Sequence, residues 1–372
     1  MAFESYKVKN GEKLRKGFTT GSAAAGAAKA AVLSLFRGEE PDSITISTPK
    51  GVELRLEPKF HGSIQGTVIA GVVKDAGDDP DVTDGLEIRA KVESAEGGEF
   101  ILEGGEGVGL VTKPGLAVEE GKAAINPVPR EMIKREVEEV LPADRGVRVT
   151  IEIPEGESVA EDTFNPKLGV EGGLSVLGTT GIVEPMSEDA YKESLAAELS
   201  QTVALGETEI VMVFGNSGER MAKKFGFRPE SIVRTSNFVG YMLDRSSGLE
   251  VETVTLFGHI GKIVKVAGGI FNTHSKVADA RLEILAGIAA YCGAERPIIK
   301  EIFGVNTAEQ AAGILLEHEF AEVFGELADR VVKRVEGRVG GGIKAKSVIF
   351  SRNSGLLGCS GLSCEEGVLK SE

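Results

Sequence analysis

The second half of the chain repeats one pattern: a short apolar run, a small-residue turn, and then a segment with helical periodicity. The apolar runs are EIVMVF (209–214), SIVR (231–234), VETVTL (251–256) and SVIFS (347–351). Runs of this length are typical of strands buried on both faces, and their alternation with helices is typical of a parallel sheet. The pattern predicts a Rossmann-like, doubly wound α/β domain over residues 187–372.

The first half alternates apolar and polar positions over shorter distances. Segments such as SITIS (43–47), VELRL (52–56) and VRVTIEI (147–153) predict short strands exposed on one face. An alanine-rich stretch ending at Phe36, with Ser22 as its expected N-cap, predicts a helix, and a second helix is expected beyond Pro129. Residues 1–186 are therefore expected to form an α+β domain with mixed strands.

Small polar residues follow each predicted strand of the second domain. In a parallel sheet these turns emerge at one edge, so we expect them to line a single crevice. The turns are Gly215-Asn216-Ser217-Gly218, Thr235-Ser236-Asn237, Gly258-His259-Ile260-Gly261 and Arg352-Asn353-Ser354. No G-x-G-x-x-G motif with an acidic partner is present, so ordinary NAD binding is disfavoured.

Residues near His259 carry the candidate chemistry of this crevice. Lys262 and Lys265 share a helix face and would suit a multiply anionic small molecule, or would be ordinary solvated lysines. His259 and His274 could be metal ligands, general bases or anion-binding donors, and a polar ligand contact is favoured over a structural role. The residues Asn272, Thr273 and Ser275 could cap the next helix, contact a ligand, or do both.

Two features of the first domain leave a functional and a structural interpretation open. Thr19 and Thr20 lie at the N-terminus of the alanine-rich helix, which could bind an anion or could simply be a capped core helix. Asp75 and Asp78 belong to an aspartate-rich loop that could face a cation, although solvated aspartates capping turns are the favoured interpretation.

Composition and charge exclude several classes of protein. The formal net charge of -15 disfavours a nucleic-acid partner, which would need a basic face. No apolar window approaches the ~20 residues of a membrane span and no signal peptide is evident, so a cytoplasmic protein is expected. The three cysteines are expected to be reduced thiols. Cys359 and Cys364 lack a second ligand pair at zinc-site spacing, so no protein-bound metal is expected.

Six long motifs are spread over nearly the whole chain. They are GFTTGSAAAGAAKAA (17–31), VVKDAGDDPDVT (72–83), INPVPREMI (125–133), LGTTGIVEPMS (177–187), TSNFVGYML (235–243) and GHIGKIVKVAGGIFNTHSKVADAR (258–281). In sequence and in order these motifs resemble the cobalt-precorrin-5B (C-1)-methyltransferases of the CbiD family, and their length makes the resemblance specific.

The resemblance implies methyl transfer from S-adenosylmethionine to carbon C-1 of cobalt-precorrin-5B, an anionic tetrapyrrole, giving cobalt-precorrin-6A in cobalamin biosynthesis. Cobalt would arrive with the substrate. Residue types then suggest roles in three groups. His259 and His274 would be catalytic; Thr19, Thr20, Lys262, Lys265, Asn272, Thr273 and Ser275 would bind substrate; Gly215, Asn216, Ser217, Gly218, Thr235, Asn237, Asp75 and Asp78 would bind the donor.

Two other classes of protein remain open, as does assembly into a homodimer. One is a corrinoid carrier without enzymatic activity. The other is an α/β enzyme acting on a nucleotide-like ligand, which the glycine-rich turns would also suit.

Overall fold

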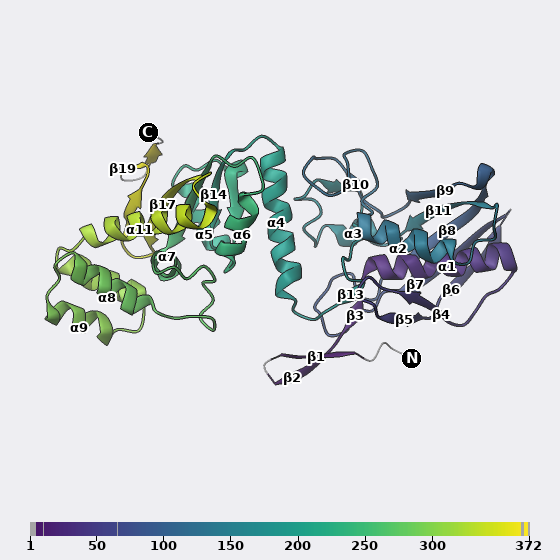
Figure 1. Ribbon diagram of the computed structural model, residues 1–372, viewed down its shortest axis with the longest axis horizontal. Coiled ribbons are helices and arrows are strands. Elements are labelled where there is room, and N and C mark those ends of the chain that lie inside the picture. The colour runs from purple at the N-terminus through teal and green to yellow at the C-terminus, as the bar shows by residue number, and fades with distance from the viewer. Residues whose placement is uncertain (1–4, 10, 65, 366–367, 371–372) are drawn as a thin grey trace. The chain divides into compact units, whose positions relative to one another are not determined.

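The computed structural model describes residues 5–9, 11–64, 66–365 and 368–370. The chain separates into two compact units, Met1–Glu188 and Asp189–Glu372 (Figure 1). Each unit combines helices with one five-stranded sheet, so the expectation of mixed α and β structure is confirmed. Among the described residues, no helix has both the length and the apolar character needed to cross a bilayer.

The first unit is built on a mixed sheet in the order β6-β7-β8-β11-β9. Only β11 and β9 pair in parallel. The strands are β6 (Lys59–Ile64), β7 (Thr67–Val73), β8 (Glu87–Ala95), β9 (Phe100–Gly104) and β11 (Gly146–Glu152). Two-stranded ladders add β1 (Tyr6–Lys9) with β2 (Glu12–Arg15), β3 (Gly17–Phe18) with β13 (Ile182–Val183), β4 (Ile44–Ser47) with β5 (Glu53–Leu56), and β10 (Leu110–Val111) with β12 (Val170–Glu171).

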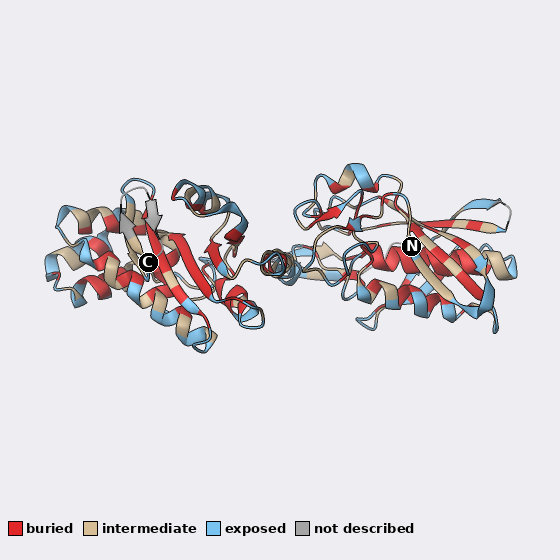
Figure 2. Ribbon diagram, turned by 90° about the horizontal axis from the view of Figure 1, so that it is seen from above, coloured by how far each residue is buried: buried red, intermediate tan, exposed pale blue. Residues whose placement is uncertain are grey.

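Helix α1 (Thr20–Arg37) lies at the centre of this unit, between the sheet and α2 (Pro127–Glu138); a short α3 (Gly156–Ala160) follows. Every residue of α1 from 20 to 33 is buried, because the alanines let neighbouring elements approach on all sides (Figure 2). The N-cap is Thr19 rather than the expected Ser22, and Thr19 accepts a hydrogen bond from the Ser22 backbone N–H. The helix therefore begins earlier than its sequence suggests.

The second unit contains a sheet in the order β15-β14-β16-β17-β18, in which the first four strands are parallel. Strand β18 pairs antiparallel to β17, so the sheet is not parallel throughout as expected. The strands are β14 (Glu209–Val213), β15 (Ile232–Arg234), β16 (Thr253–His259), β17 (Lys344–Ser351) and β18 (Gly355–Ser360), and β19 (Ser363–Glu365) pairs with β20 (Val368–Lys370). The helices are α4 (Glu188–Ala204), α5 (Asn216–Lys224), α6 (Val239–Ser246), α7 (Ile260–Ala267), α8 (Arg281–Tyr291), α9 (Arg296–Gly304), α10 (Ala308–Glu317) and α11 (Glu322–Val339).

Both faces of this sheet are buried. Met212 and Leu256 belong to the large core that includes residues of α6, α7, α8, α10 and α11. Val213 and Phe257 point to the opposite face and pack in a smaller core with Ala222 of α5. Burial on both faces explains why the strands read as continuous apolar runs.

Two local expectations were wrong. The segment 276–280 is not helical, so the cluster Asn272 to Ser275 does not cap the following helix, which begins at Arg281. Cys359 is in a disulfide, although all three cysteines were expected to be reduced; Cys292 is a free thiol, as expected.

Candidate functional site

The carboxyl ends of four parallel strands bring the polar turns of the second unit to one edge of the sheet. The turns after β14, β15, β16 and β17 all emerge there, because the strands run in the same direction. Arg234 bridges two of these turns, with Nη1 at 3.5 Å from Asn216 Oδ1. In α/β proteins, ligands bind at the carboxyl ends of the parallel strands.

A three-residue polar cluster lies at this edge and joins β15, α7 and the loop after α7. Lys262 Nζ donates to Asn237 Oδ1 at 2.5 Å, and Thr273 Oγ1 donates to the same oxygen at 3.2 Å. Burial lowers the pKa of Lys262, and the positive charges of Lys265 and Arg281 lower it further. Lys262 is therefore a half-buried amine among other cations, an arrangement suited to receiving a negatively charged group.

The turn that carries Asn237 is strained. Ser236 has a φ of 51°, in the left-handed region that residues other than glycine rarely adopt. The conformation is maintained by contacts on both sides, since Thr273 N–H donates to Asn237 O and Thr235 N–H donates to Val213 O. Strain of this kind is concentrated at functional sites.

Lys265 has a different setting from Lys262, although both were expected to meet the substrate. Its side chain is only 3% exposed, and Nζ donates to the carbonyl oxygens of Thr273 and Ala278. Desolvation lowers the pKa of Lys265, and the carboxylate of Asp279 opposes that effect. Lys265 fastens the loop 270–280 to α7 and thereby supports the cluster around Lys262.

His259 is the N-cap of α7. Its Nδ1 accepts a hydrogen bond from Gly261 N–H at 3.1 Å, so the neutral ring carries its proton on Nε2. Nε2 lies 2.6 Å from Glu309 Oε2, and both atoms are buried without a regular hydrogen bond. Burial lowers the pKa of His259, Glu309 raises it, and Arg352 lowers it. Nδ1 is thus occupied and Nε2 is buried against Glu309, so neither ring nitrogen is exposed to a ligand.

Packing accounts for the glycine before His259. A Cβ atom at Gly258 would lie 2.4 Å from the ring of Phe214, whereas one at Gly261 would lie 3.3 Å from His259 Nδ1, a tight distance that a small shift can relieve. Gly258 therefore needs no ligand to explain it.

The loop 270–280 places His274 and Ser275 at the surface. His274 Nδ1 accepts from Lys276 N–H, and His274 N–H donates to Asn272 Oδ1. Thr273 is buried, and it connects this loop to Asn237 through one side-chain and one backbone hydrogen bond.

Among the residues expected to bind the methyl donor, Asn216, Ser217 and Gly218 form the first turn of α5, and Gly215 is its N-cap with a φ of 121°. Thr235 is fully buried, and its Oγ1 donates to Val213 O. Thr235 thus stabilises the turn after β15, while Asn216 and Ser217 are exposed at the sheet edge.

Thr19 and Thr20 lie in the first unit and make hydrogen bonds to backbone groups of the same unit. Thr20 Oγ1 donates to Leu177 O and accepts from Leu177 N–H. The N–H groups of Thr19 and Gly21 donate to the carbonyl oxygens of Gly181 and Leu177. The start of α1 is therefore covered by the 177–181 segment, as in a capped core helix.

Asp75 and Asp78 are also engaged within the first unit. Asp75 forms two hydrogen bonds with the Arg15 guanidinium, and that contact, the largest cause, lowers its pKa. Asp78 accepts from the backbone N–H of Arg15. These carboxylates close the aspartate-rich loop against β2.

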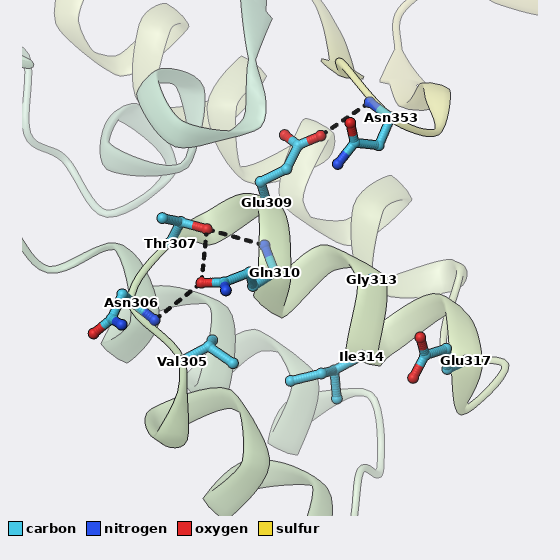
Figure 3. A pocket seen from close by; sticks show the side chains of 9 residues that line it. All are labelled: Val305, Asn306, Thr307, Glu309, Gln310, Gly313, Ile314, Glu317 and Asn353. Carbon is cyan, nitrogen blue, oxygen red and sulfur yellow. Dashed lines mark hydrogen bonds between the residues drawn. The ribbon is translucent and has the colours of Figure 1, made fainter.

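An open groove of about 700 Å³ lies beside the carboxyl edge, where α10 meets the turn after β17 (Figure 3). Glu309 and Asn353 face each other across its upper end, joined by a hydrogen bond of 3.1 Å. The groove is lined by Val305, Asn306, Thr307, Glu309, Gln310, Gly313, Ile314, Glu317 and Asn353. Its polar groups are carboxylates, amides and a hydroxyl.

No group of three or more His, Cys, Asp or Glu side chains within the described ranges is arranged to hold a metal ion. Sequence reasoning missed Glu309 and Ser351. Glu309 is recognisable only as an acidic residue in a helical first turn, and nothing local relates it to His259, fifty positions earlier.

The amino-acid sequence matches the CbiD family model over residues 7–185 and the CbiD C-terminal domain model over residues 272–361. A relative from Alkaliphilus metalliredigens is 47% identical over 371 residues, which are 99% of this chain and 98% of that protein. The chain belongs to the CbiD family. A second CbiD relative, from Thermoanaerobacter sp., is 47% identical over 367 residues, 97% of this chain and all of that protein. Both relatives are named cobalt-precorrin-5B C(1)-methyltransferase.

One solved structure is also similar to the chain: the 1.9 Å crystal structure of cobalamin biosynthesis protein (cbiD) from Archaeoglobus fulgidus. It is 28% identical and covers 74% of this chain and 87% of its own, with a TM-score of 0.40. A score this low adds no argument about the fold. Family membership therefore rests on the sequence matches.

Proposed function

We propose that this CbiD protein transfers a methyl group from S-adenosylmethionine to carbon C-1 of cobalt-precorrin-5B, giving cobalt-precorrin-6A in cobalamin biosynthesis. The observation that carries the proposal is the 47% identity over 371 residues to a relative named for that methyl transfer. Identity at this level over whole chains supports a shared reaction.

The reaction needs alignment more than acid or base strength. The methyl carbon moves from sulfur to the ring carbon, whose π electrons form the new bond, and the electron pair of the broken S–C bond stays on sulfur. The donor is already activated by its positive charge, so the protein has to align the two reactants and exclude water. Cobalt belongs to the substrate, and the proposal includes no metal held by the protein.

The substrate site is proposed at the cluster of Asn237, Lys262 and Thr273. A tetrapyrrole with acetate and propionate arms is multiply anionic, and Lys262 lies among the positive charges that lower its pKa. A substrate carboxylate can replace Asn237 Oδ1 as the partner of the Lys262 amine. His274 and Ser275, exposed on the adjoining loop, are proposed to contact the macrocycle, and His259 to contact it through ring carbons.

The methyl donor is proposed at the same sheet edge, at the turn from Gly215 to Gly218. We also propose that the second domain, residues 187–372, is Rossmann-like. The strand order supports this, because the sheet grows in opposite directions from β14 towards β15 and towards β16. Ligands bind at such a reversal point in doubly wound folds. For Thr19, Thr20, Asp75 and Asp78, which make hydrogen bonds within the first unit, we propose a structural role in place of ligand binding.

Thermal unfolding with S-adenosylhomocysteine tests the proposal, because a ligand that binds only the folded protein raises the melting temperature. We expect a saturable increase, alone or with a corrinoid present. Stabilisation by the corrinoid alone, with no donor effect in either condition, would indicate a carrier. Stabilisation by nucleotides but not by S-adenosylhomocysteine would indicate a nucleotide enzyme.

A further inference from the structure

The two carboxylate oxygens of Glu309 contact different elements: Oε1 contacts the end of β17, and Oε2 contacts His259 at the end of β16. Oε1 accepts from Ser351 Oγ at 2.5 Å and from Asn353 N–H at 3.1 Å, both at the end of β17. Ser351 Oγ is itself fixed, since it accepts from the N–H groups of Asn353 and Ser354. Oε2 lies against Nε2 of His259. The carboxylate thus connects the ends of β16 and β17 to α10.

The carboxylate of Glu309 is maintained in its charged form. The residue lies in the first turn of α10, whose N-cap is Thr307, and a helix N-terminus favours a negative charge there. Burial opposes the charge, but the bonds from Ser351 and Asn353 and the proximity of His259 outweigh it, so the pKa of Glu309 is lowered. An anion at this place favours the His259 tautomer with the proton on Nε2.

That tautomer is the one that can cap α7. With the proton on Nε2, Nδ1 is free to accept from Gly261 N–H. A proton on Nδ1 would set two donors against each other and remove the cap. Lys262 follows Gly261 directly, so the cap fixes the turn from which its amine reaches Asn237.

We propose that Glu309 is a positioning residue: through His259 it holds the first turn of α7, and with it Lys262, in the geometry that the proposed methyl transfer requires. The inference rests on the proposed function, in which Lys262 receives a substrate carboxylate. Besides Glu309, the charged group that acts on His259 is Arg352, from the turn after β17.

Ring nitrogen NMR tests the proposal without substrate. The chain has four histidines, so ¹⁵N-histidine labelling with a His259→Asn variant for assignment isolates one ring. We expect neutral His259 to carry its proton on Nε2 and to titrate below the ordinary pKa of 6.5. In Glu309→Gln, which keeps the side-chain shape, the pKa should fall further because the negative charge that favours the imidazolium is gone. An unchanged pKa, or a proton on Nδ1 in the parent protein, would overturn the proposal.

The kinetic test uses the same variants. With Glu309→Gln, the acidic limb of kcat/KM should move to lower pH, following the pKa of His259. Glu309→Ala, which no longer fixes the tautomer, should raise KM for the tetrapyrrole about tenfold. Glu283→Gln removes the same charge from the exposed first turn of α8 and is the matched control.

If Glu309 has a purely structural role, the Glu309→Gln variant will have a lower melting temperature but the same pH profile of kcat/KM as the parent protein. That outcome would also overturn the proposal. If the parent protein transfers no methyl group, the proposed function fails, whereas the NMR titration still decides whether Glu309 controls His259.

Discussion

Lys262 and Asn237 are 25 positions apart, and Nζ of the lysine lies 2.5 Å from Oδ1 of the asparagine. The contact joins the turn after β15 to the first turn of α7, at the carboxyl edge of the parallel strands. A neutral amide oxygen is a weaker partner for an ammonium group than a carboxylate. Asn237 therefore holds the amine in place and can release it to an anionic substrate.

Replacing Lys262 by Ala should raise KM for the tetrapyrrole about tenfold and change kcat by less, because the amine binds the substrate as strongly before the reaction as during it. Steady-state kinetics check this, with Lys300→Ala, an exposed lysine of α9, as the control. A fall in kcat at unchanged KM would remove Lys262 from the binding role.

The pH dependence of binding should reflect the lowered pKa of Lys262. As pH rises through that pKa, which lies below the ordinary 10.5, the amine loses its charge and KM should increase. In Lys262→Arg the rise should move to higher pH, since a guanidinium stays charged. A KM profile with the same alkaline limb in both proteins would show that another group causes it.

Lys265→Met should act on stability. The change removes two hydrogen bonds that the buried ammonium group donates to Thr273 O and Ala278 O. A hydrogen bond from a charged group contributes roughly 1.5–3 kcal/mol to stability. We expect the free energy of unfolding to fall by about 2 kcal/mol in denaturant titrations. An unchanged midpoint with a large increase in KM would mean that Lys265 meets the substrate directly.

Glu184 makes the first unit sensitive to acid. It contacts Lys7, Lys16 and Lys50, and these hydrogen bonds, led by the one from Lys50, lower its pKa from 4.5 to about 2. A carboxylate whose pKa is lowered by folding stabilises the folded state at pH values above its pKa in the unfolded chain. For Glu184 this contribution is lost as the pH falls from 4.5 towards 2.

Glu184→Gln should therefore lower the free energy of unfolding at pH 7, and the difference from the parent protein should shrink as the pH is lowered through this window. Urea titrations at a series of pH values measure the difference. A difference that stays constant with pH would show that the charge of Glu184 is not what stabilises the fold.

The gathering of the polar turns at the carboxyl ends of the parallel strands is what the sequence could predict. Strands such as EIVMVF are recognisable in the sequence by their length and apolar character. Because these strands are parallel, Gly215, Asn237 and His259 all lie at their carboxyl ends. The antiparallel β18 was not predicted, because its sequence, GLLGCS, has no pattern that fixes direction.

Pairwise roles could not be predicted, because they depend on long-range contacts. Lys262 and Lys265 look alike in sequence, yet one turn of helix separates a half-buried amine that contacts Asn237 from a buried one that binds backbone carbonyls. Thr20 resembles an anion-binding position, but Leu177, 157 positions away, takes up its hydroxyl. The carboxylate beside His259 belongs to Glu309, and no local motif predicts that contact.

The most direct test of the account is product analysis with a donor whose methyl carbon is ¹³C. Cobalt-precorrin-5B is incubated with the protein and labelled S-adenosylmethionine, and the tetrapyrrole is examined by mass spectrometry and carbon NMR. The account predicts one added labelled methyl group, bonded to C-1, in amounts that increase with enzyme and are reduced in Lys262→Ala at low substrate concentration. Recovery of bound but unmethylated tetrapyrrole, or a label at another ring carbon, would contradict it.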